Sequence, residues 1–495
     1  VMTTETTCLS SIWHTDEKVR EYYRIHEREG DYRELKPLAP ACYDGMIDVD
    51  LSMVEPMIAM PFHPGNTYTI RGLIENAADI FALVEKDARA IMGEKADYRI
   101  RDKIRGKDIL VDQGIIAGCA GGTFENIFEA AAILAGKNPG NSDFSLSVYP
   151  QSQPVNYELN RAGVIGRLMD TGVLMKTAFC GPCFGAGDVP GNNALSIRHT
   201  TRNFPNREGS KPGQGQIAGV ALMDARSIAA TAANGGILTP ATQTGYTIGE
   251  HDYAFNGQIY RNRVYNGYQK PLDVELKYGP GIKDWPVMGK LSRNLLLMAA
   301  AVIHDPVTTT DELIPSGETS SYRSDPLRLA EFTLSRKDPL YVGRAKKAMG
   351  MEKERASGTL RKYEGLDLGD TGIGSFIYAT KPGDGSAREQ AASCQRVLGG
   401  MANVALDYAT KRYRSNLVNW GILPFVVDSP PDLEPGDFLY LPGIREVVET
   451  GKEQILALLL KKGMTQEIVL RLPRLTDDER KIILSGCLMN HYKRD

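Results

Sequence analysis

DILVDQGIIAGCAGGTFENIFEAAAILAG, residues 108–136, is the stretch that most directly indicates the fold of this chain. A strand-like apolar run ends at Cys119, and a helical run follows in which five apolar residues share one face: Phe124, Ile127, Phe128, Ala131 and Leu134. Strand-like and helical runs alternate in this way from about residue 108 to residue 236, with helices expected over 123–136 and 155–172 and a further helix capped by Asp224. The alternation predicts an α/β fold with three layers, in which helices cover both faces of a parallel sheet. Ligand sites in such sheets lie beyond the carboxyl ends of the strands, where Cys119 and Cys180 are expected.

The composition is that of an ordinary globular protein. A length of 495 residues predicts about three domains, and a net charge of −3 offers no basic surface for nucleic acid. The longest apolar run, residues 294–303, is half the length that a membrane-spanning helix needs. The N-terminal residues lack the layout of a secretory signal, and seven sparsely spaced cysteines do not resemble a disulfide framework. These features predict a reduced, cytoplasmic protein without a membrane partner.

Cys180-Gly181-Pro182-Cys183 has the spacing of either a redox dithiol or a metal site. A thioredoxin-type dithiol needs its first cysteine at a helix N-terminus. Residues 184–191 contain three glycines and a proline and do not begin a helix, which disfavours the dithiol. If Cys119 is a third ligand, three thiolates around one iron–sulfur cluster leave one iron without a protein ligand. A structural zinc on three cysteines and one other residue remains an alternative.

Five short segments then occur in a fixed order. They are AGCAGGTFEN with Cys119 and Glu125, CGPC beginning 61 residues after Cys119, RNFPNR with Arg202 and Arg207, TTD with Arg323 twelve residues beyond Asp311, and GDGSAREQAA with Ser386 and Arg388. Together these segments resemble the motifs of the aconitase family of iron–sulfur hydratases. Any one of them alone would be a weak signal, but five in order over some 270 residues make a specific match.

The resemblance implies a function and a set of site residues. A 4Fe–4S cluster, or a 3Fe–4S cluster when oxidised, is expected on Cys119, Cys180 and Cys183. The family's catalytic positions fall on Ser386, as an alkoxide base, and on Asp311. Carboxylates of the substrate are expected to pair with four arginines: Arg202, Arg207, Arg323 and Arg388. The predicted reaction is the dehydration and rehydration of a hydroxy di- or tricarboxylate resembling citrate or isocitrate. The predicted enzyme is a hydro-lyase that resembles aconitate hydratase and acts on a tricarboxylic acid or a similar substrate.

Two of these assignments have competing local explanations. SARE, residues 386–389, is also a capping box, in which Ser386 would accept from free amides of the helix and Glu389 would reach back. Arginines, for their part, are most often solvated surface charges. Both alternatives stay open on the sequence alone.

The resemblance also implies a domain arrangement. Residues 1–45 are expected to be the tail of an absent N-terminal region, and 46–240 to be the cluster-binding α/β domain. Residues 241–300 would form a linker and 301–495 a C-terminal swivelling β/α domain. Two further α/β domains of the family are expected either in the same gene product or in a separate chain.

The sequence departs from the family's motifs at four places. Ala387 replaces a second serine, Thr201 replaces an asparagine, Glu312 replaces a histidine, and Ala120-Gly121 replaces Thr-Asn. These changes fall at expected substrate contacts, while the three cluster cysteines are retained. They favour an altered substrate. An alternative is a protein on the same scaffold with lost or weak catalysis that senses iron or binds RNA.

Overall fold

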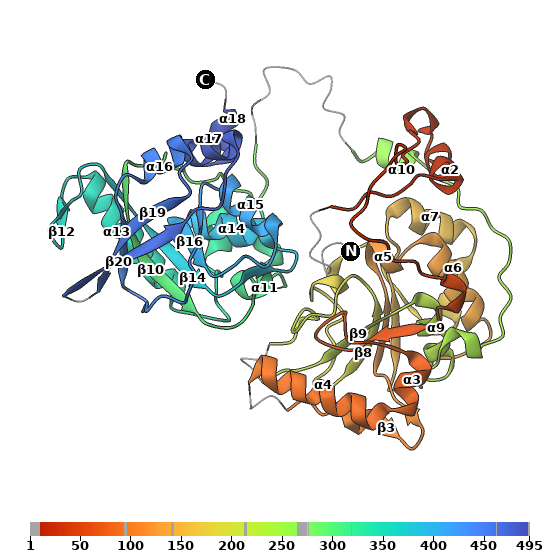
Figure 1. Cartoon of the computed structure of the whole chain (residues 1–495). Coiled ribbons are helices and arrows are strands. Elements are labelled where there is room, and N and C mark those ends of the chain that lie inside the picture. Colours follow the sequence, from red (N-terminus) through yellow and green to blue (C-terminus); the bar gives the residue numbers. More distant parts are fainter. Residues whose placement is uncertain are drawn as a thin grey trace. The chain divides into compact units, whose positions relative to one another are not determined.

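The computed structural model describes residues 10–93, 97–139, 143–211, 215–264, 275, 277–317, 319–461 and 463–493. The chain forms two compact units, here called the first unit (Ser11–Val274) and the second unit (Glu275–Asp495), and each is described by itself (Figure 1). Both units combine helices with sheets, so the predicted mixed α/β class is confirmed.

The first unit is built on a seven-stranded sheet. Its order is β2 (Thr67–Thr69), β1 (Met57–Ala59), β9 (Gly219–Met223), β8 (Leu195–His199), β5 (Gln113–Ile116), β6 (Ser145–Val148) and β7 (Leu174–Met175). The five strands from β9 to β7 are parallel, as predicted, whereas β1 pairs antiparallel with both β9 and β2. The carboxyl ends of the parallel strands lie at one edge of the sheet. Cys119 comes after the end of β5, and Cys180 comes after the end of β7.

Helices of the first unit follow from caps and apolar spacing. They are α2 (Glu17–Ile25), α3 (Ile70–Glu75), α4 (Ala77–Met92), α5 (Gly118–Gly121), α6 (Phe124–Leu134), α7 (Gln153–Arg161), α8 (Val164–Asp170), α9 (Ala225–Ala233) and α10 (Gln258–Arg261). Asp224 caps α9 as predicted, because its carboxylate accepts from the Ser227 N–H at 2.9 Å. The single helix predicted over residues 155–172 is two helices, since Gly163 adopts φ +69° between them.

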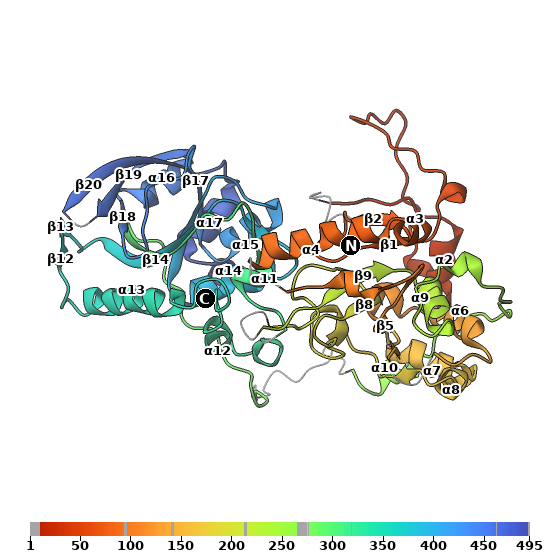
Figure 2. The same cartoon turned by 90° about the horizontal axis from the view of Figure 1, so that it is seen from below.

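The core of the first unit lies between its sheet and these helices. Helix α6 packs on α9, and α9 packs on β5 and β8 (Figures 1 and 2). Fully buried aliphatic residues such as Ile116, Ile127 and Ile228 join the sheet to the two helices. A short hairpin of β3 (Ile104–Arg105) and β4 (Asp108–Ile109) precedes β5. The turn after β5 is attached to α6, because the Asn126 side-chain amide donates to the Ala120 carbonyl at 3.1 Å.

The second unit contains a closed barrel. Its strand order is β10 (Asn294–Ile303), β14 (Thr371–Ala379), β16 (Gly400–Ala405), β17 (Leu423–Val426), β20 (Met464–Arg471), β19 (Gln454–Lys461) and β18 (Phe438–Leu441). The first four strands are parallel, and the antiparallel pairing of β18 with β10 closes the barrel. Two further pairs are β11 (Thr308–Thr309) with β15 (Pro382–Asp384), and β12 (Lys362–Tyr363) with β13 (Leu366–Asp367).

The helices of the second unit are short apart from one. They are α11 (Thr310–Leu313), α12 (Pro326–Ala330), α13 (Tyr341–Ala356), α14 (Arg388–Val397), α15 (Lys411–Asn419), α16 (Ile444–Thr450), α17 (Asp477–Ser485) and α18 (Leu488–Tyr492). The apolar run 294–303 is strand β10 and is almost wholly buried. Within the described ranges, no helix combines the length and apolar character needed to cross a bilayer. The domain boundaries expected at residues 45, 240 and 300 stay predictions; β10 runs through residue 300.

Candidate functional site

Cys119 lies in the one-turn helix α5, directly after β5 in the first unit. The turn is tight, and it contains Gly118 directly before Cys119 and Gly121 two residues after it. Gly118 adopts φ +73°, and a Cβ on Gly121 would collide with the carbonyl oxygen of His199 at the end of β8. Backbone of this turn therefore lies directly against the neighbouring strand. The Cys119 side chain is exposed.

Cys180 and Cys183 flank a short 3-10 turn over Gly181–Cys183. The Cys183 N–H donates to the Cys180 carbonyl at 3.0 Å, and the chain then folds back so that the Ala186 N–H donates to Gly181 at 3.0 Å. The turn does not continue into an α-helix, which agrees with the argument against a redox dithiol. Cys180 is exposed and Cys183 is buried.

The structure brings the two cysteine segments together. A Cβ built on Gly118 would lie 2.9 Å from the Sγ of Cys183, so the turn that carries Cys119 packs directly on that sulfur. The pKa of the Cys183 thiol is raised, first by burial and then by the charges of Cys180 and Cys119, while Arg207 and an N–H of Thr201 act to lower it. The three predicted cluster cysteines and Arg207 thus share one electrostatic environment.

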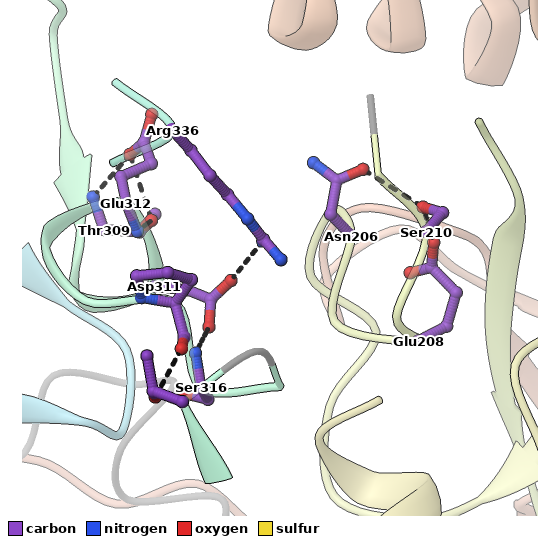
Figure 3. A network of polar contacts seen from close by, with 10 residues as sticks. Asn206, Glu208, Ser210, Thr309, Asp311, Glu312, Ser316 and Arg336 are labelled. Atoms are coloured by element: carbon purple, nitrogen blue, oxygen red, sulfur yellow. Dashed lines mark hydrogen bonds and ion pairs between the residues drawn. The ribbon is translucent and has the colours of Figure 1, made fainter. Parts of the chain in front are cut away.

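Arg202 and Arg207 lie in the loop that follows β8, and both are half-buried. The residue after Arg202 anchors this loop to the sheet. Its side-chain amide, on Asn203, donates to the carbonyl of Met60 at 2.6 Å and is itself 1% exposed. Further along, Ser210 donates to Asn206 at 3.3 Å and to the buried carboxylate of Glu208 (Figure 3). The backbone that carries both arginines is therefore fixed at two points.

Asp311 in the second unit is held by two donors. Its carboxylate accepts from the Ser316 N–H at 2.9 Å and forms an ion pair with Arg336 at 3.2 Å (Figure 3). Thr309 and Glu312 form a capping box at the start of α11, so the glutamate that replaces the family's histidine has a structural use here. The Ser316 N–H and the Arg336 guanidinium fix the direction of the Asp311 side chain.

Ser386 and Arg388 lie beside the Asp311 segment, because β15 pairs in parallel with β11. The Ala387 N–H donates to Thr310 Oγ1 at 3.2 Å, and Gly385, at φ +114°, leaves no room for a Cβ against the same hydroxyl. Ser386 is exposed and precedes α14, whose first residue, Arg388, is buried. The second unit thus brings three of its four predicted site residues to one region.

The capping-box interpretation of residues 386–389 is wrong. The N-cap of α14 is Ala387, and no side chain caps the helix. Glu389 turns away from the N-terminus and accepts from the Trp420 indole N–H at 2.5 Å and from an Asn416 amide. The capping hydrogen bond was expected from spacing alone, whereas the tertiary contact with α15 decides where the glutamate goes. Ser386 is left without this structural use.

Arg323 lies at the end of a 3-10 turn over Ser320–Tyr322 and is exposed. The turn is held by its tyrosine, whose ring stacks on Phe332 with centroids 5.4 Å apart and an interplanar angle of 16°. A guanidinium from Arg328 covers the same tyrosine ring at 4.3 Å. Arg323 is therefore carried on a packed turn.

Cys119, Cys180 and Cys183 are the candidate ligands of a metal centre or cluster. Within the described residues, no three His, Cys, Asp or Glu side chains are arranged to hold one metal ion. A structural zinc needs four ligands around one centre. A cluster instead binds each cysteine through a different iron, so its sulfurs surround a larger body and do not converge on a point. In this structure a Cβ on Gly118 would lie 2.9 Å from the Cys183 sulfur, so the turn that carries Cys119 lies against the Cys-Gly-Pro-Cys segment.

Comparison with known proteins supports the same family. Residues 1–230 match the model of the aconitase family (aconitate hydratase). The mitochondrial aconitate hydratase of Aspergillus fumigatus is 25% identical over 92% of this chain and 58% of its own length. The 3-isopropylmalate dehydratase large subunit of Wolinella succinogenes is 28% identical over 38% of this chain and 38% of its own. A solved 3-isopropylmalate dehydratase (leuD) structure from Methanocaldococcus jannaschii matches over 40% of this chain and 92% of its own length at 22% identity, with a TM-score of only 0.26.

These relatives are hydro-lyases, aconitate hydratase and 3-isopropylmalate dehydratase. The resemblance to the aconitase family that the five sequence segments indicated is thereby confirmed. The chain spans about half the length of the curated relatives it matches.

Proposed function

We propose that this chain carries the cluster-binding and carboxylate-binding residues of an iron–sulfur hydro-lyase that acts on a hydroxy di- or tricarboxylate. The main supporting observation is that the turn carrying Cys119 packs on Cys183. A Cβ on Gly118 would lie only 2.9 Å from the Cys183 sulfur. It is supported by the family match over residues 1–230 and by relatives that are hydro-lyases.

Cys119, Cys180 and Cys183 would hold a 4Fe–4S cluster. When bound, a cluster with three protein ligands offers an open iron, a Lewis acid for the hydroxyl and a neighbouring carboxylate of the substrate. Because Cys119 and Cys180 are exposed and Cys183 is buried, the protein would hold one corner deeply and leave the opposite side accessible. This asymmetry suits a catalytic cluster that must admit a substrate.

Arginine side chains would select for a substrate with several carboxylates. Arg202 and Arg207 belong to the loop that also carries Thr201, whose N–H reaches Cys183. A guanidinium pairs with a carboxylate through two parallel hydrogen bonds, which fixes the orientation of the carboxylate. Arg323 and Arg388 are assigned the same role in the second unit. The proposal therefore favours di- and tricarboxylates over monocarboxylates.

Ser386 would remove the carbon-bound proton through its Oγ. A serine alkoxide is a strong base only where fixed positive groups stabilise it. The N–H groups at the start of the ten-residue helix α14, together with the side chain of Arg388, are such groups. Asp311, oriented by Ser316 and Arg336, would act beside it.

The departures from the family bear on the substrate. Ala387 lacks the hydroxyl that would support an oxyanion, and losing one such donor costs on the order of a hundredfold in rate. Thr201 and Glu312 change two further contacts, and Glu312 is committed to its capping box. The proposal therefore keeps the substrate class, a hydroxy polycarboxylate, and does not specify citrate. The cytoplasmic location remains a prediction from composition.

Further aconitase-type domains, in the same product or in a separate chain, are part of this proposal. Its support is that the chain covers 58% of the length of the Aspergillus fumigatus relative. Assays of turnover should accordingly be run both with the purified chain and with cell extract from which it is captured.

Anaerobic reconstitution with iron and sulfide tests the proposal. We expect a brown protein with the visible absorbance of a cluster, an electron paramagnetic resonance signal after mild oxidation to 3Fe–4S, and a change of that spectrum on adding citrate, isocitrate or methylcitrate. Cys119→Ser should lose the cluster, whereas Cys42→Ser, at another exposed cysteine, should keep it. A wild-type chain that binds one zinc and no cluster would refute the proposal. A cluster whose spectrum ignores all three acids would favour the non-catalytic alternative.

A further inference from the structure

Arg198 is a cation inside the first unit that the sequence motifs do not include. It lies on β8, it is 1% exposed, and it is the largest of the fully buried side chains. Burying a guanidinium is costly unless its N–H groups are satisfied. Here all the hydrogen bonds described go to neutral oxygens, and two of those oxygens belong to the loop after Cys180.

The guanidinium joins two points of that loop. One Nη donates to the Pro182 carbonyl at 2.7 Å, inside the Cys-Gly-Pro-Cys turn, and the other donates to the Asp188 carbonyl at 3.0 Å. The remaining hydrogen bonds fix the guanidinium itself, since Nε donates to Ser196 at 2.9 Å and Nη2 to Gln113 at 3.2 Å. One rigid side chain therefore sets the separation between the cysteine turn and residue 188.

A second contact that holds this loop comes from Tyr149, directly after β6. The Tyr149 hydroxyl donates to the carboxylate of Asp188, a residue held at φ +48°. Burial and this hydrogen bond both raise the pKa of Tyr149, so the phenol stays protonated as the donor. Gln113 Nε2 also donates to the Asp188 carbonyl, at 3.2 Å. Asp188, at the far end of the loop, is thus attached to β5 through Gln113, to β8 through Arg198, and to Tyr149 directly after β6.

The Arg198 guanidinium lies within electrostatic range of one of the cysteines, Cys183. The ionisable groups whose fields reach the guanidinium are the carboxyl groups of Glu208 and Asp188, the thiol of Cys183 and the phenol of Tyr149. Burial lowers the pKa of Arg198 to about 10, which leaves it protonated at neutral pH. A fixed positive charge therefore lies beside the turn that carries Cys183.

We infer that Arg198 is the positioning residue of the Cys-Gly-Pro-Cys loop, with Tyr149 as its second fastening point. The guanidinium holds the loop in the conformation that presents Cys180 and Cys183 to a common ligand, and it places a positive charge next to that ligand. The identity of the ligand as an anionic iron–sulfur cluster rests on the proposed function. The conformation of the loop does not.

Amide hydrogen exchange of the cluster-free chain tests the positioning role. Tyr149→Phe removes one oxygen, and Arg198→Lys keeps the charge without the planar fork of donors. Both variants should exchange residues 180–190 roughly fivefold faster or more, the effect of losing about one net hydrogen bond. Tyr98→Phe is the matched control, because Tyr98 is a buried tyrosine of the same unit whose hydroxyl donates to the Ala194 carbonyl at 3.5 Å, outside residues 180–190. Unchanged exchange in the first two variants would overturn the inference.

The reduction potential of the reconstituted cluster tests the role of the charge. A nearby cation stabilises the more negative, reduced cluster. Arg198→Gln should therefore lower the potential, measured by a redox titration followed by electron paramagnetic resonance, while Arg198→Lys should keep it close to that of the wild type. Equal potentials in all three proteins would overturn the electrostatic part.

If Arg198→Gln does not fold, the comparison of Arg198→Lys with the wild type and the exchange of Tyr149→Phe still decide the positioning role. If the wild type assembles no cluster, the proposed function fails, and the exchange experiment still decides the inference.

Discussion

At the scale of single residues, the contact between Gly118 and Cys183 is the most sensitive point of the candidate site. Gly118→Ala introduces a Cβ 2.9 Å from the Cys183 sulfur at a residue with φ +73°. We expect the sulfur to be displaced and the left-handed backbone to add about 1 kcal/mol of strain. Iron and sulfide content after anaerobic reconstitution should fall several-fold relative to the wild type.

Gly136→Ala separates the two effects. Gly136 has a similar φ of +69° but no atom within 4 Å of its Cβ position. Its alanine variant should lose a similar free energy of unfolding and still load a full cluster. If both variants load equally, the turn at Gly118 does not form part of a cluster site.

Ser386→Ala tests the assigned base. Ser386 is exposed and caps no helix, so its hydroxyl contributes little to the free energy of unfolding. We expect thermal unfolding and the cluster spectrum to match those of the wild type while turnover of the hydroxy acid falls by at least a thousandfold, roughly 4 kcal/mol in transition-state stabilisation. Ser357→Ala, at an exposed serine that closes α13, is the control. Undiminished turnover in Ser386→Ala would remove the serine from the mechanism.

At the scale of elements, the sequence predicts best where local and tertiary preferences agree. Helix α6 was expected over 123–136 and is found at Phe124–Leu134, because Thr123 caps a segment with one apolar face. The parallel order of β5, β6 and β7 follows from the same alternation. The break at Gly163 was missed, since a single glycine inside a helical pattern does not reveal whether it takes positive φ.

Tertiary contacts were beyond the reach of such patterns. The cysteine and arginine segments could be found because their motifs are contiguous in sequence. Arg198 could not be found in this way, because a single basic residue in the strand LSIRH is also expected where a side chain faces outward. The closure of the barrel by β18 and β10 depends on residues about 140 positions apart, and no local signal encodes it.

Helix α7 supplies a pH-dependent prediction. The carboxylate of Glu158 accepts from Arg161 at 2.9 Å and from His251 at 3.2 Å. The hydrogen bond with Arg161, followed by that with His251, lowers the pKa of Glu158 below its usual 4.5. A lowered carboxyl pKa stabilises the fold above pH 4.5, and this stabilisation is lost as the pH falls through the folded-state value.

Glu158→Gln should therefore unfold at a lower urea concentration than the wild type at pH 7, and the gap between the two midpoints should close on acidification below pH 4.5. Glu17→Gln, at an exposed glutamate of α2, should show no such gap. A gap that widens in acid would contradict the assigned direction of the shift.

At the scale of the whole molecule, the two units have separate cores. Among the described residues, the main buried apolar cluster of the first unit draws on residues 58–238, and the three clusters around the barrel draw on residues 288–487. A closed barrel has no free edge strand, and about 220 residues bury enough surface to fold independently.

We predict that residues 275–495 expressed alone give a folded domain with one cooperative urea transition, and that the full chain shows two calorimetric transitions, one of which matches this domain. Leu297→Ala, which opens a cavity at a fully buried barrel residue, should lower the transition of residues 275–495 by about 2–5 kcal/mol and shift only the matching transition of the full chain. A single transition that moves as a whole would show instead that the two cores unfold as one cooperative unit.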